Sequence, residues 1–189
     1  HAYNEPISIL NSLGVEKKIP LYNFLGSNLE LSNTPYFPHV SFDEFKYIKA
    51  DVPFHEKWNL NKCIQRDSKR ESLIFNKYVK KENYVVTHLK ASIHTADFDK
   101  SLIPGNFQVI EIDNYGFVLD WLKVIEKAKM IFMTNSVMAN ITEQLNIGKC
   151  RHYIPRTNVF INPTFINNWI WLKNKNLDPK TNLTGIKFK

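Results

Sequence analysis

Short hydrophobic runs alternate with amphipathic segments along the last two-thirds of the chain. The runs 84–89, 107–112 and 130–133 are short and apolar, as buried strands are. Helical spacing of apolar residues marks 68–80 and 117–129 between them. Because parallel strands need crossover connections, this alternation predicts an α/β protein with a Rossmann-like, mostly parallel sheet and flanking helices.

The remaining C-terminal elements follow from local signals. A helix is predicted over 137–145, a fourth strand over Cys150–Ile154, and a closing helix over 165–172 with Thr164 as its N-cap.

Local signals also define the helix at 68–80. Asp67 is predicted to be its N-cap, and Leu73, Ile74 and Tyr78 are expected to face inward.

Prolines divide the first third of the chain into short predicted elements. Residues 19–25 are expected to form a buried strand, and Ser41 or Asp43 to cap a short helix that ends at Lys49. We assign 1–50 to an N-terminal segment that is compatible with an α+β arrangement. The rest, 51–189, is assigned to a Rossmann-like nucleotide-binding domain with a basic C-terminal tail.

Composition narrows the class of protein. The chain is 43% hydrophobic and 13% aromatic, which suits a packed globular protein. Its two cysteines are too few for a disulfide framework or a structural zinc site. Since no apolar run approaches about 18 residues, we expect no membrane span and a cytoplasmic protein. The net charge of +7 favours an anionic partner such as nucleic acid, a nucleotide diphosphate or an acidic membrane surface.

Candidate chemistry gathers where strands are predicted to end, because ligands of open α/β sheets bind there. Thr134, Asn135 and Ser136 form a turn between a strand and a helix, whose free N–H groups favour phosphate. Simple helix capping by Thr134 or Ser136 explains the same residues, and from the turn alone it is the favoured explanation. His88 ends another strand as a candidate general base, and Lys90 follows it as a candidate phosphate contact.

Two arginines extend the list of candidate anion contacts. Arg156 follows the predicted fourth strand, and with Arg151, His152 and Tyr153 it is expected near the turn at Ser136. Arg66 precedes a helix start, where the dipole disfavours a cation, so it either reaches elsewhere or binds an anion.

Several enzyme classes are disfavoured by missing motifs. No GxGxxG follows a strand, and GxxxxGK[ST], HExxH and GxSxG do not occur. This argues against a dinucleotide oxidoreductase, a P-loop enzyme, a zincin and an α/β-hydrolase.

A larger set of short motifs, taken together, resembles a group of small glycosyltransferase-like proteins from bacteria and viruses. The set is Val52-Pro53-Phe54 with Lys57-Trp58, Arg66-Asp67 with Arg70-Glu71, the strand Tyr84–His88, Asp120 to Ala128, Ile131 to Ser136, His152-Tyr153, Arg156 and Pro163-Thr164.

By this resemblance the second half is similar to the donor-binding half of GT-B glycosyltransferases. The resemblance implies transfer of a hexosyl- or fucosyl-type sugar from a nucleotide-sugar donor to a glycan or other hydroxyl acceptor, with no metal or other cofactor. It implies that Asn135 and Ser136 meet the donor diphosphate, that Arg156 is a further anion contact, and that His88 matches the group's strand-end histidine. Residues 1–50 would then be a reduced acceptor subdomain.

Two other functions stay open at this stage. The charge and the aromatic residues Tyr78, Tyr84, Trp169 and Trp171 also suit a nucleic-acid-binding or nucleic-acid-modifying protein. The third alternative is a Rossmann-like interaction module without catalytic activity, since a fold alone does not fix a function.

Overall fold

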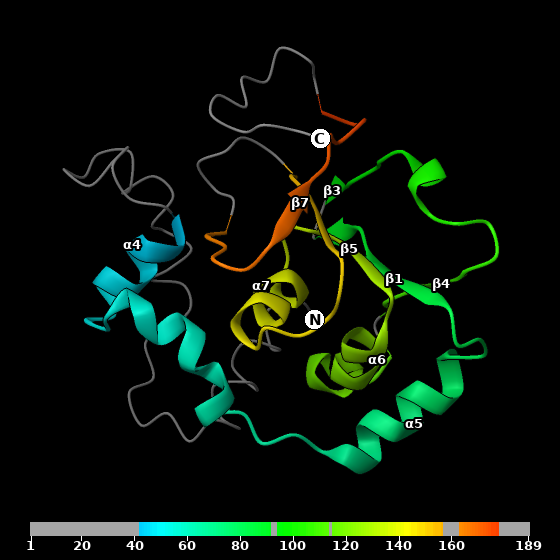
Figure 1. Cartoon of the computed structure of the whole chain (residues 1–189). Coiled ribbons are helices and arrows are strands. Elements are labelled where there is room, and N and C mark those ends of the chain that lie inside the picture. The colour runs from blue at the N-terminus through cyan, green and yellow to red at the C-terminus, as the bar shows by residue number, and fades with distance from the viewer. Residues whose placement is uncertain (1–41, 92–93, 114, 157–162, 178–189) are drawn as a thin grey trace.

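The computed structural model describes residues 42–91, 94–113, 115–156 and 163–177. The expected strand at 19–25 and the candidate cap Ser41 lie outside the described residues. Within these ranges the central feature is a five-stranded sheet in the order β4-β1-β5-β6-β7 (Figure 1). Its strands are β1 (Tyr84–His88), β4 (Gln108–Glu111), β5 (Met130–Thr134), β6 (Arg151–Ile154) and β7 (Trp169–Trp171).

Every pair of neighbouring strands in this sheet is parallel, as the alternation of strands and helices predicts. The apolar run at 84–89 forms a central strand, with β4 on one side and β5 on the other. The α/β, Rossmann-like fold class is therefore confirmed.

Helices cover one face of the sheet. α5 (Ser68–Tyr78), α6 (Leu122–Lys127) and α7 (Val137–Gln144) contribute to one core cluster, together with Val86 and Met133 from the strands. A short 3₁₀ helix, η3 (Val118–Trp121), leads into α6.

The other face carries no α-helix in the described part of the chain. There Val85, Phe132 and Ile154 pack against Phe98 and Leu172, which belong to irregular segments. The chain between β1 and β4 covers this face with the two-residue strands β2 (Lys90–Ala91) and β3 (His94–Thr95) and the 3₁₀ helix η2 (Lys100–Leu102).

The order in which the chain visits the strands explains why, among the described residues, the α-helical connections lie on one face and the irregular connection lies on the other. From β1 the chain steps to β4 at one edge, and afterwards it moves the opposite way through β5, β6 and β7. Because crossovers between parallel strands share one hand, steps in opposite directions place their connections on opposite faces. The helical connections α6 and α7 thus share a face, and the irregular first connection takes the other.

Helix α5 confirms its predicted start. Asp67 is the N-cap, and its carboxylate accepts hydrogen bonds from the backbone N–H groups of Lys69 (3.0 Å) and Arg70 (3.1 Å). Ile74 is buried as expected, whereas Leu73 is 70% exposed, so its inward assignment is wrong. α5 makes its most extensive contacts with η3 and α6, and neighbouring helix positions point about 100° apart.

The segment 117–129 is helical but divided into η3 and α6. Trp121, Leu122, Val124 and Ile125 are all buried there. Apolar residues surround this segment because it lies between the sheet and α5.

The predicted closing helix at 165–172 is wrong. Trp169–Trp171 instead forms β7, which pairs in parallel with β6. The ring of Trp171 lies 4.6 Å from that of Tyr153 on β6, measured between centroids. The open edge of β6 offers backbone partners and an aromatic neighbour, and large aromatic residues suit such a pleated surface.

Two further helices precede the sheet in sequence. α4 (Phe42–Lys49) occupies the short helix predicted to end at Lys49, and η1 (Phe54–Lys62) is a 3₁₀ helix. Asp43 lies inside the first turn of α4 and is not its N-cap. No helix in the described part of the chain is long and apolar enough to cross a membrane.

The connection from α7 to β6 is a short turn that contains residues in the left-handed backbone conformation, with positive φ. Asn146 has φ +52°, and the N–H groups of Asn146 and Ile147 donate to the carbonyls of Glu143 and Thr142, which is the Schellman pattern. Gly148 follows with φ +79°. Arg151 then donates to the carbonyls of Ile147 and Gly148, so its guanidinium closes this loop.

We predict that Gly148→Ala lowers the free energy of unfolding by at least about 1–2 kcal/mol, the usual cost of a left-handed residue with a Cβ. A Cβ at Gly148 would also lie 3.0 Å from Cδ1 of Ile131. The matched control is Gly105→Ala, where a Cβ meets nothing within 4 Å. Urea unfolding should show Gly105→Ala within about 1 kcal/mol of the parent. Equal effects of the two substitutions would contradict the prediction.

Candidate functional site

The strand order reverses between β1 and β5. From β1 the chain leaves toward β4, and from β5 it leaves toward β6. Connections diverge at such a point and leave a crevice at the carboxyl ends of the two strands, where open α/β sheets bind ligands. His88 is the last residue of β1 and Thr134 the last of β5.

His88 and Ser136 meet at this point. The Nδ1 atom of His88 lies 3.0 Å from Oγ of Ser136, although the two are separated by 48 positions in the sequence. Ser136 is also the N-cap of α7, since its Oγ accepts a hydrogen bond from the N–H of Ala139 at 3.3 Å. His88 and Ser136, which the sequence analysis identified independently as candidate site residues, are therefore in contact.

Burial and a neighbouring carboxylate act on His88 in opposite senses. Burial lowers the pKa of His88, and the negative charge of Glu111 at the end of β4 partly offsets this. The neutral imidazole is therefore favoured near neutral pH. Glu111 itself pairs with Lys90, whose Nζ lies 3.5 Å from Oε1, and both side chains are largely exposed.

The contact between His88 and Ser136 allows two tautomers. With the proton on Nδ1, His88 donates to Oγ of Ser136 and Nε2 carries a free lone pair. With the proton on Nε2, the hydroxyl of Ser136 donates to Nδ1 instead. The first arrangement provides a proton acceptor at Nε2, and the second polarises the serine hydroxyl.

Arg156 lies at the same edge of the sheet. Thr134 and Ile154 are register partners, and Ser136 and Arg156 each stand two residues beyond them. In the described part of the chain, the buried Nε of Arg156 and the buried Oγ1 of Thr134 have no hydrogen-bond partner. Asn135, between Thr134 and Ser136, is half-buried.

Arg66 is placed elsewhere. Its guanidinium donates to both carboxylate oxygens of Glu71, at 2.8 and 2.6 Å, and to Glu126 at 2.9 Å. Glu126 belongs to α6 just before β5 begins, so Arg66 lies toward the amino end of that strand. Its guanidinium stabilises helix packing, and we do not retain it in the site.

The expected place of Arg151 is also wrong. It begins β6 and pairs with Ile131, near the start of β5, so it lies at the opposite end of the strands from Ser136.

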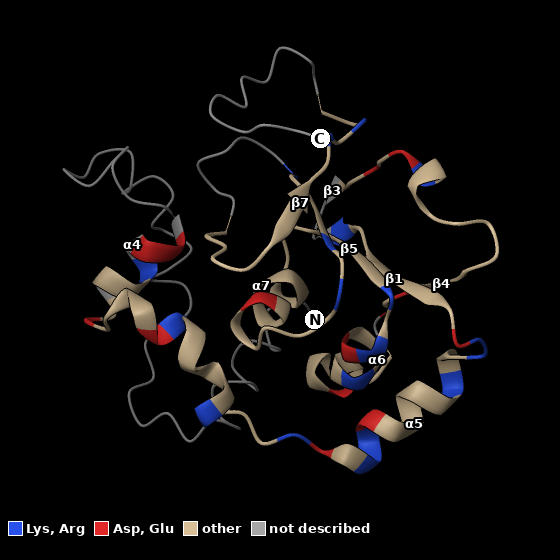
Figure 2. Cartoon of the chain, viewed as in Figure 1, with Lys and Arg blue, Asp and Glu red and all other residues tan. Residues whose placement is uncertain are grey.

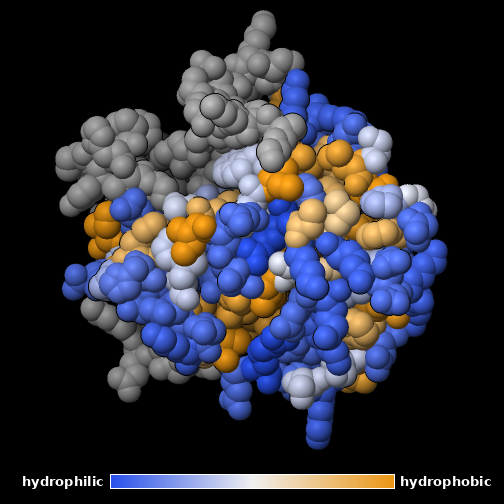
Figure 3. Space-filling view, in the orientation of Figure 1, coloured by the Kyte–Doolittle hydropathy of each residue, from blue (hydrophilic) through white to orange (hydrophobic). Residues whose placement is uncertain are grey.

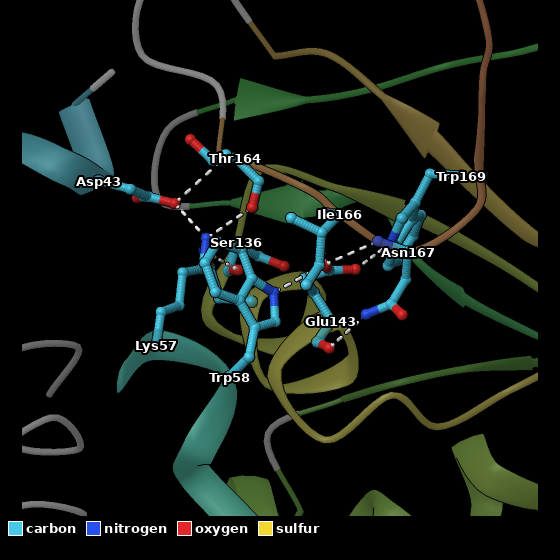
Figure 4. A network of polar contacts seen from close by, with 10 residues as sticks. Asp43, Lys57, Trp58, Ser136, Glu143, Thr164, Ile166, Asn167 and Trp169 are labelled. Carbon is cyan, nitrogen blue, oxygen red and sulfur yellow. Dashed lines mark hydrogen bonds and ion pairs between the residues drawn. The ribbon is translucent and has the colours of Figure 1, made fainter. Parts of the chain in front are cut away.

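A buried carboxylate that the sequence analysis missed supports the site (Figure 4). Glu143 of α7 is fully buried. Its Oε1 accepts hydrogen bonds from Nε1 of Trp58 (2.9 Å) and from the N–H groups of Ile166 (2.8 Å) and Asn167 (3.1 Å). Its Oε2 accepts one from Nε1 of Trp169 at 2.8 Å. One side chain thereby joins η1, α7 and β7.

Hydrogen bonding decides the charge state of Glu143. Burial alone would raise the pKa of this carboxyl, but the donors from Ile166, Trp58, Trp169 and Asn167 together outweigh burial and lower it. The ionised carboxylate is thus the form that the fold stabilises. One sequence signal could have identified this residue: Glu143 is the only ionisable residue in the segment that forms α7.

A largely buried ion pair adjoins this network (Figure 4). Nζ of Lys57 is 2.6 Å from Oδ2 of Asp43 and 2.7 Å from the carbonyl oxygen of Thr164. The N–H of Thr164 donates to the same Asp43 oxygen at 3.1 Å. Thr164 therefore joins the C-terminal segment to α4 and η1, and it does not cap a helix.

The aromatic residues considered for base stacking are mostly engaged in packing. Tyr84 is buried and donates through its hydroxyl to the carbonyl of Val124. Trp169 and Trp171 are half-buried and pack with Phe165 and Tyr153. They do not form an exposed stacking surface.

Charge on the described surface is mixed. Lys, Arg, Asp and Glu are interspersed on α5 and α6 (Figure 2). The visible face in Figure 3 is largely hydrophilic, with scattered hydrophobic patches. Among the described residues no group of three His, Cys, Asp or Glu side chains is arranged to hold a metal ion.

In comparisons with protein-family models, curated proteins and solved structures, no match to this chain was found.

We predict a graded effect of substitutions at Glu143. Glu143→Leu leaves four N–H donors without an acceptor and should lower the free energy of unfolding by about 3–5 kcal/mol. Glu143→Gln keeps an acceptor at Oε1 and places an amide opposite Trp169, so about 1–2 kcal/mol is expected. Denaturant unfolding measures both. A Gln variant as unstable as the Leu variant would contradict this account.

We also predict that stability falls in mild acid. Burial lowers the pKa of His88 and of His152, so the unfolded chain binds more protons at these positions than the folded chain. Their stabilisation is complete above the ordinary histidine pKa of about 6.5 and is lost as the pH falls toward the lower folded value. The free energy of unfolding, measured by urea titration between about pH 7.5 and pH 5, should decrease, and less steeply in His88→Asn. Identical slopes in the two proteins would count against a buried His88.

Proposed function

We propose that the chain binds a nucleotide-sugar donor and transfers its sugar to a hydroxyl acceptor. The donor diphosphate would lie at the 135–136 turn beside Arg156, and His88 would act as the general base. The observation that supports this most is the 3.0 Å contact between His88 and Ser136 at the switch point of the sheet.

The turn offers suitable groups for a diphosphate. The N-terminus of α7 presents backbone N–H groups and the positive end of the helix dipole. Arg156 adds a guanidinium at the same edge, with one buried N–H free of any partner among the described residues. A guanidinium donates two parallel hydrogen bonds to phosphate oxygens. These groups would stabilise the negative charge that the diphosphate gains on leaving.

Proton transfer would follow from the neutral state of His88. With Nδ1–H donating to Ser136, the lone pair of Nε2 takes the proton of the acceptor hydroxyl. The acceptor oxygen then forms a bond to the anomeric carbon of the sugar, and the bond from that carbon to the diphosphate oxygen breaks. The electron pair of that bond leaves with the nucleoside diphosphate, and the configuration at the anomeric carbon is inverted.

A nucleic-acid partner remains the alternative function. The net charge of +7 favours it. Within the described residues, however, Lys57, Arg66, Arg70 and Lys90 all face carboxylates in ion pairs. We therefore give preference to the donor-binding function.

The test is a thermal-shift screen with nucleoside diphosphates and their sugar conjugates. A ligand that binds only the folded chain adds about 2.7 kcal/mol of stability at 100 times its Kd. Each shift is measured relative to the ligand-free melting temperature of the same variant. We expect one diphosphate to stabilise the parent protein, and Arg156→Ala to lose most of that shift.

Two variants serve as sharper controls. Ser136→Asp keeps a good N-cap but adds a negative charge, so it should fold normally and lose the ligand shift. Arg66→Ala removes the same charge as Arg156→Ala at the other end of the strands, and its ligand shift should match the parent. No shift with any diphosphate, together with salt-sensitive DNA binding, would overturn the proposal in favour of the nucleic-acid alternative.

A further inference from the structure

A cavity of about 470 Å³ lies over β1 and β4, on the face of the sheet that carries no α-helix among the described residues. This volume is within the usual range of small-molecule sites. It occupies the space beneath the first crossover, where the chain between β1 and β4 forms η2 and irregular loops.

The walls of this cavity are mostly apolar. Phe98, Ile103, Phe107 and Val109 line it, and Val109 is 53% exposed. Successive residues of a strand point to opposite faces, so Val109 and Glu111 face the cavity while Ile110 belongs to the core on the helical side. The charged residues in the lining are Lys100 and Glu111. An apolar wall with such polar groups beside it suits a flat, largely apolar group that carries hydroxyls.

The cavity lies beside the switch-point site but on the opposite face of β1, because Thr87 and His88 are successive residues of that strand. Thr87 lines the cavity and immediately precedes His88, and Glu111 is the register partner of Thr87. The carboxylate of Glu111 acts electrostatically on His88. A ligand that uses both must therefore cross the carboxyl end of β1 between the 135–136 turn and the cavity.

Charge favours one direction for such a ligand. The cavity lining carries both a cation and a carboxylate, Lys100 and Glu111, whereas the N-terminus of α7 and Arg156 offer N–H donors and positive charge, so we place the phosphates at Ser136 and Arg156. Ribose hydroxyls, in contrast, donate charge-assisted hydrogen bonds to a carboxylate. Dinucleotide-binding sheets place an acidic residue on the ribose in this way. The ion pair of Lys90 with Glu111 is exposed at 3.5 Å, and pairs of this kind contribute little stability, so a ligand can displace it.

We propose that this cavity is a nucleoside subsite, with the base against Phe98, Ile103 and Phe107 and the ribose hydroxyls on Glu111. This inference rests on the proposed function, since it takes the nucleoside end of the same donor. It adds that the base and the ribose contribute to recognition of the donor.

The experiment uses two kinds of probe on the full chain. Free ribonucleosides and 2′-deoxyribonucleosides, which carry no phosphate, are tested by saturation-transfer NMR. Nucleoside diphosphates and inorganic pyrophosphate are compared by calorimetry. We expect one nucleoside to bind with a preference for ribose, and its diphosphate to bind at least about tenfold more tightly than pyrophosphate, a difference of about 1.4 kcal/mol.

Two variants alter the cavity. Val109→Trp places a large ring on a half-exposed strand residue, and Glu111→Ala removes the hydroxyl acceptor. Val109→Trp should reduce nucleoside diphosphate affinity to that of pyrophosphate and leave pyrophosphate binding unchanged. Glu111→Ala should abolish the preference for ribose. Leu73→Trp, on an α5 residue that is 70% exposed and does not line the cavity, is the matched control and should change neither affinity.

The outcomes separate this inference from the proposed function. Equal affinities for diphosphates and pyrophosphate, unaffected by Val109→Trp, would overturn the nucleoside subsite and leave the phosphate site standing. Nucleoside binding that is lost in Val109→Trp, without any gain from phosphates, would support the subsite and overturn the donor function. Binding of none of these probes would overturn both.

Discussion

The buried carboxylate of Glu143 is the interaction on which the rest of this structure depends. Its four N–H donors come from η1 and from the segment that leads into β7. Burying a charge is costly unless it is fully hydrogen-bonded, so these segments must all be in place for the carboxylate to be stable. Glu143 lies on α7, whose first turn carries Ser136. The network that fixes this helix therefore also positions its N-cap against His88.

The strand order then determines which strand ends lie near the N-terminus of α7. Because β1 lies between β4 and β5, the carboxyl ends of β1 and β5 are neighbours although their connections diverge. Ser136 begins the connection on the helical side, and Leu89 begins the one that covers the opposite face. The proposed diphosphate contacts thus lie at the switch point, where the connections of open α/β sheets leave a crevice at the strand ends.

The uneven covering of the two faces has a chemical consequence. α6 and α7 fill the helical side with a continuous core, whereas the crossover from β1 to β4 contains no α-helix in its described residues. Short irregular segments cover a sheet less completely than helices, and a cavity remains beneath them. In its lining, Thr87 precedes His88 on β1, and Glu111 lies on β4, the other neighbour of β1. Nucleoside recognition and catalysis would then use opposite faces of β1.

The sequence by itself determined the fold class, the parallel sheet and the cap Asp67, because hydrophobic periodicity and capping are local. It failed where partners are distant. Glu143 is bonded to Trp58 across 85 positions, and no local pattern reports such a pair. Where a helix was predicted, the N–H groups of Ile166 and Asn167 instead donate to Glu143, and Trp169–Trp171 pairs with β6 as β7. Only the tertiary structure decided that His88 meets Ser136 while Arg66 and Arg151 lie elsewhere, because strand order places side chains that sequence spacing leaves independent.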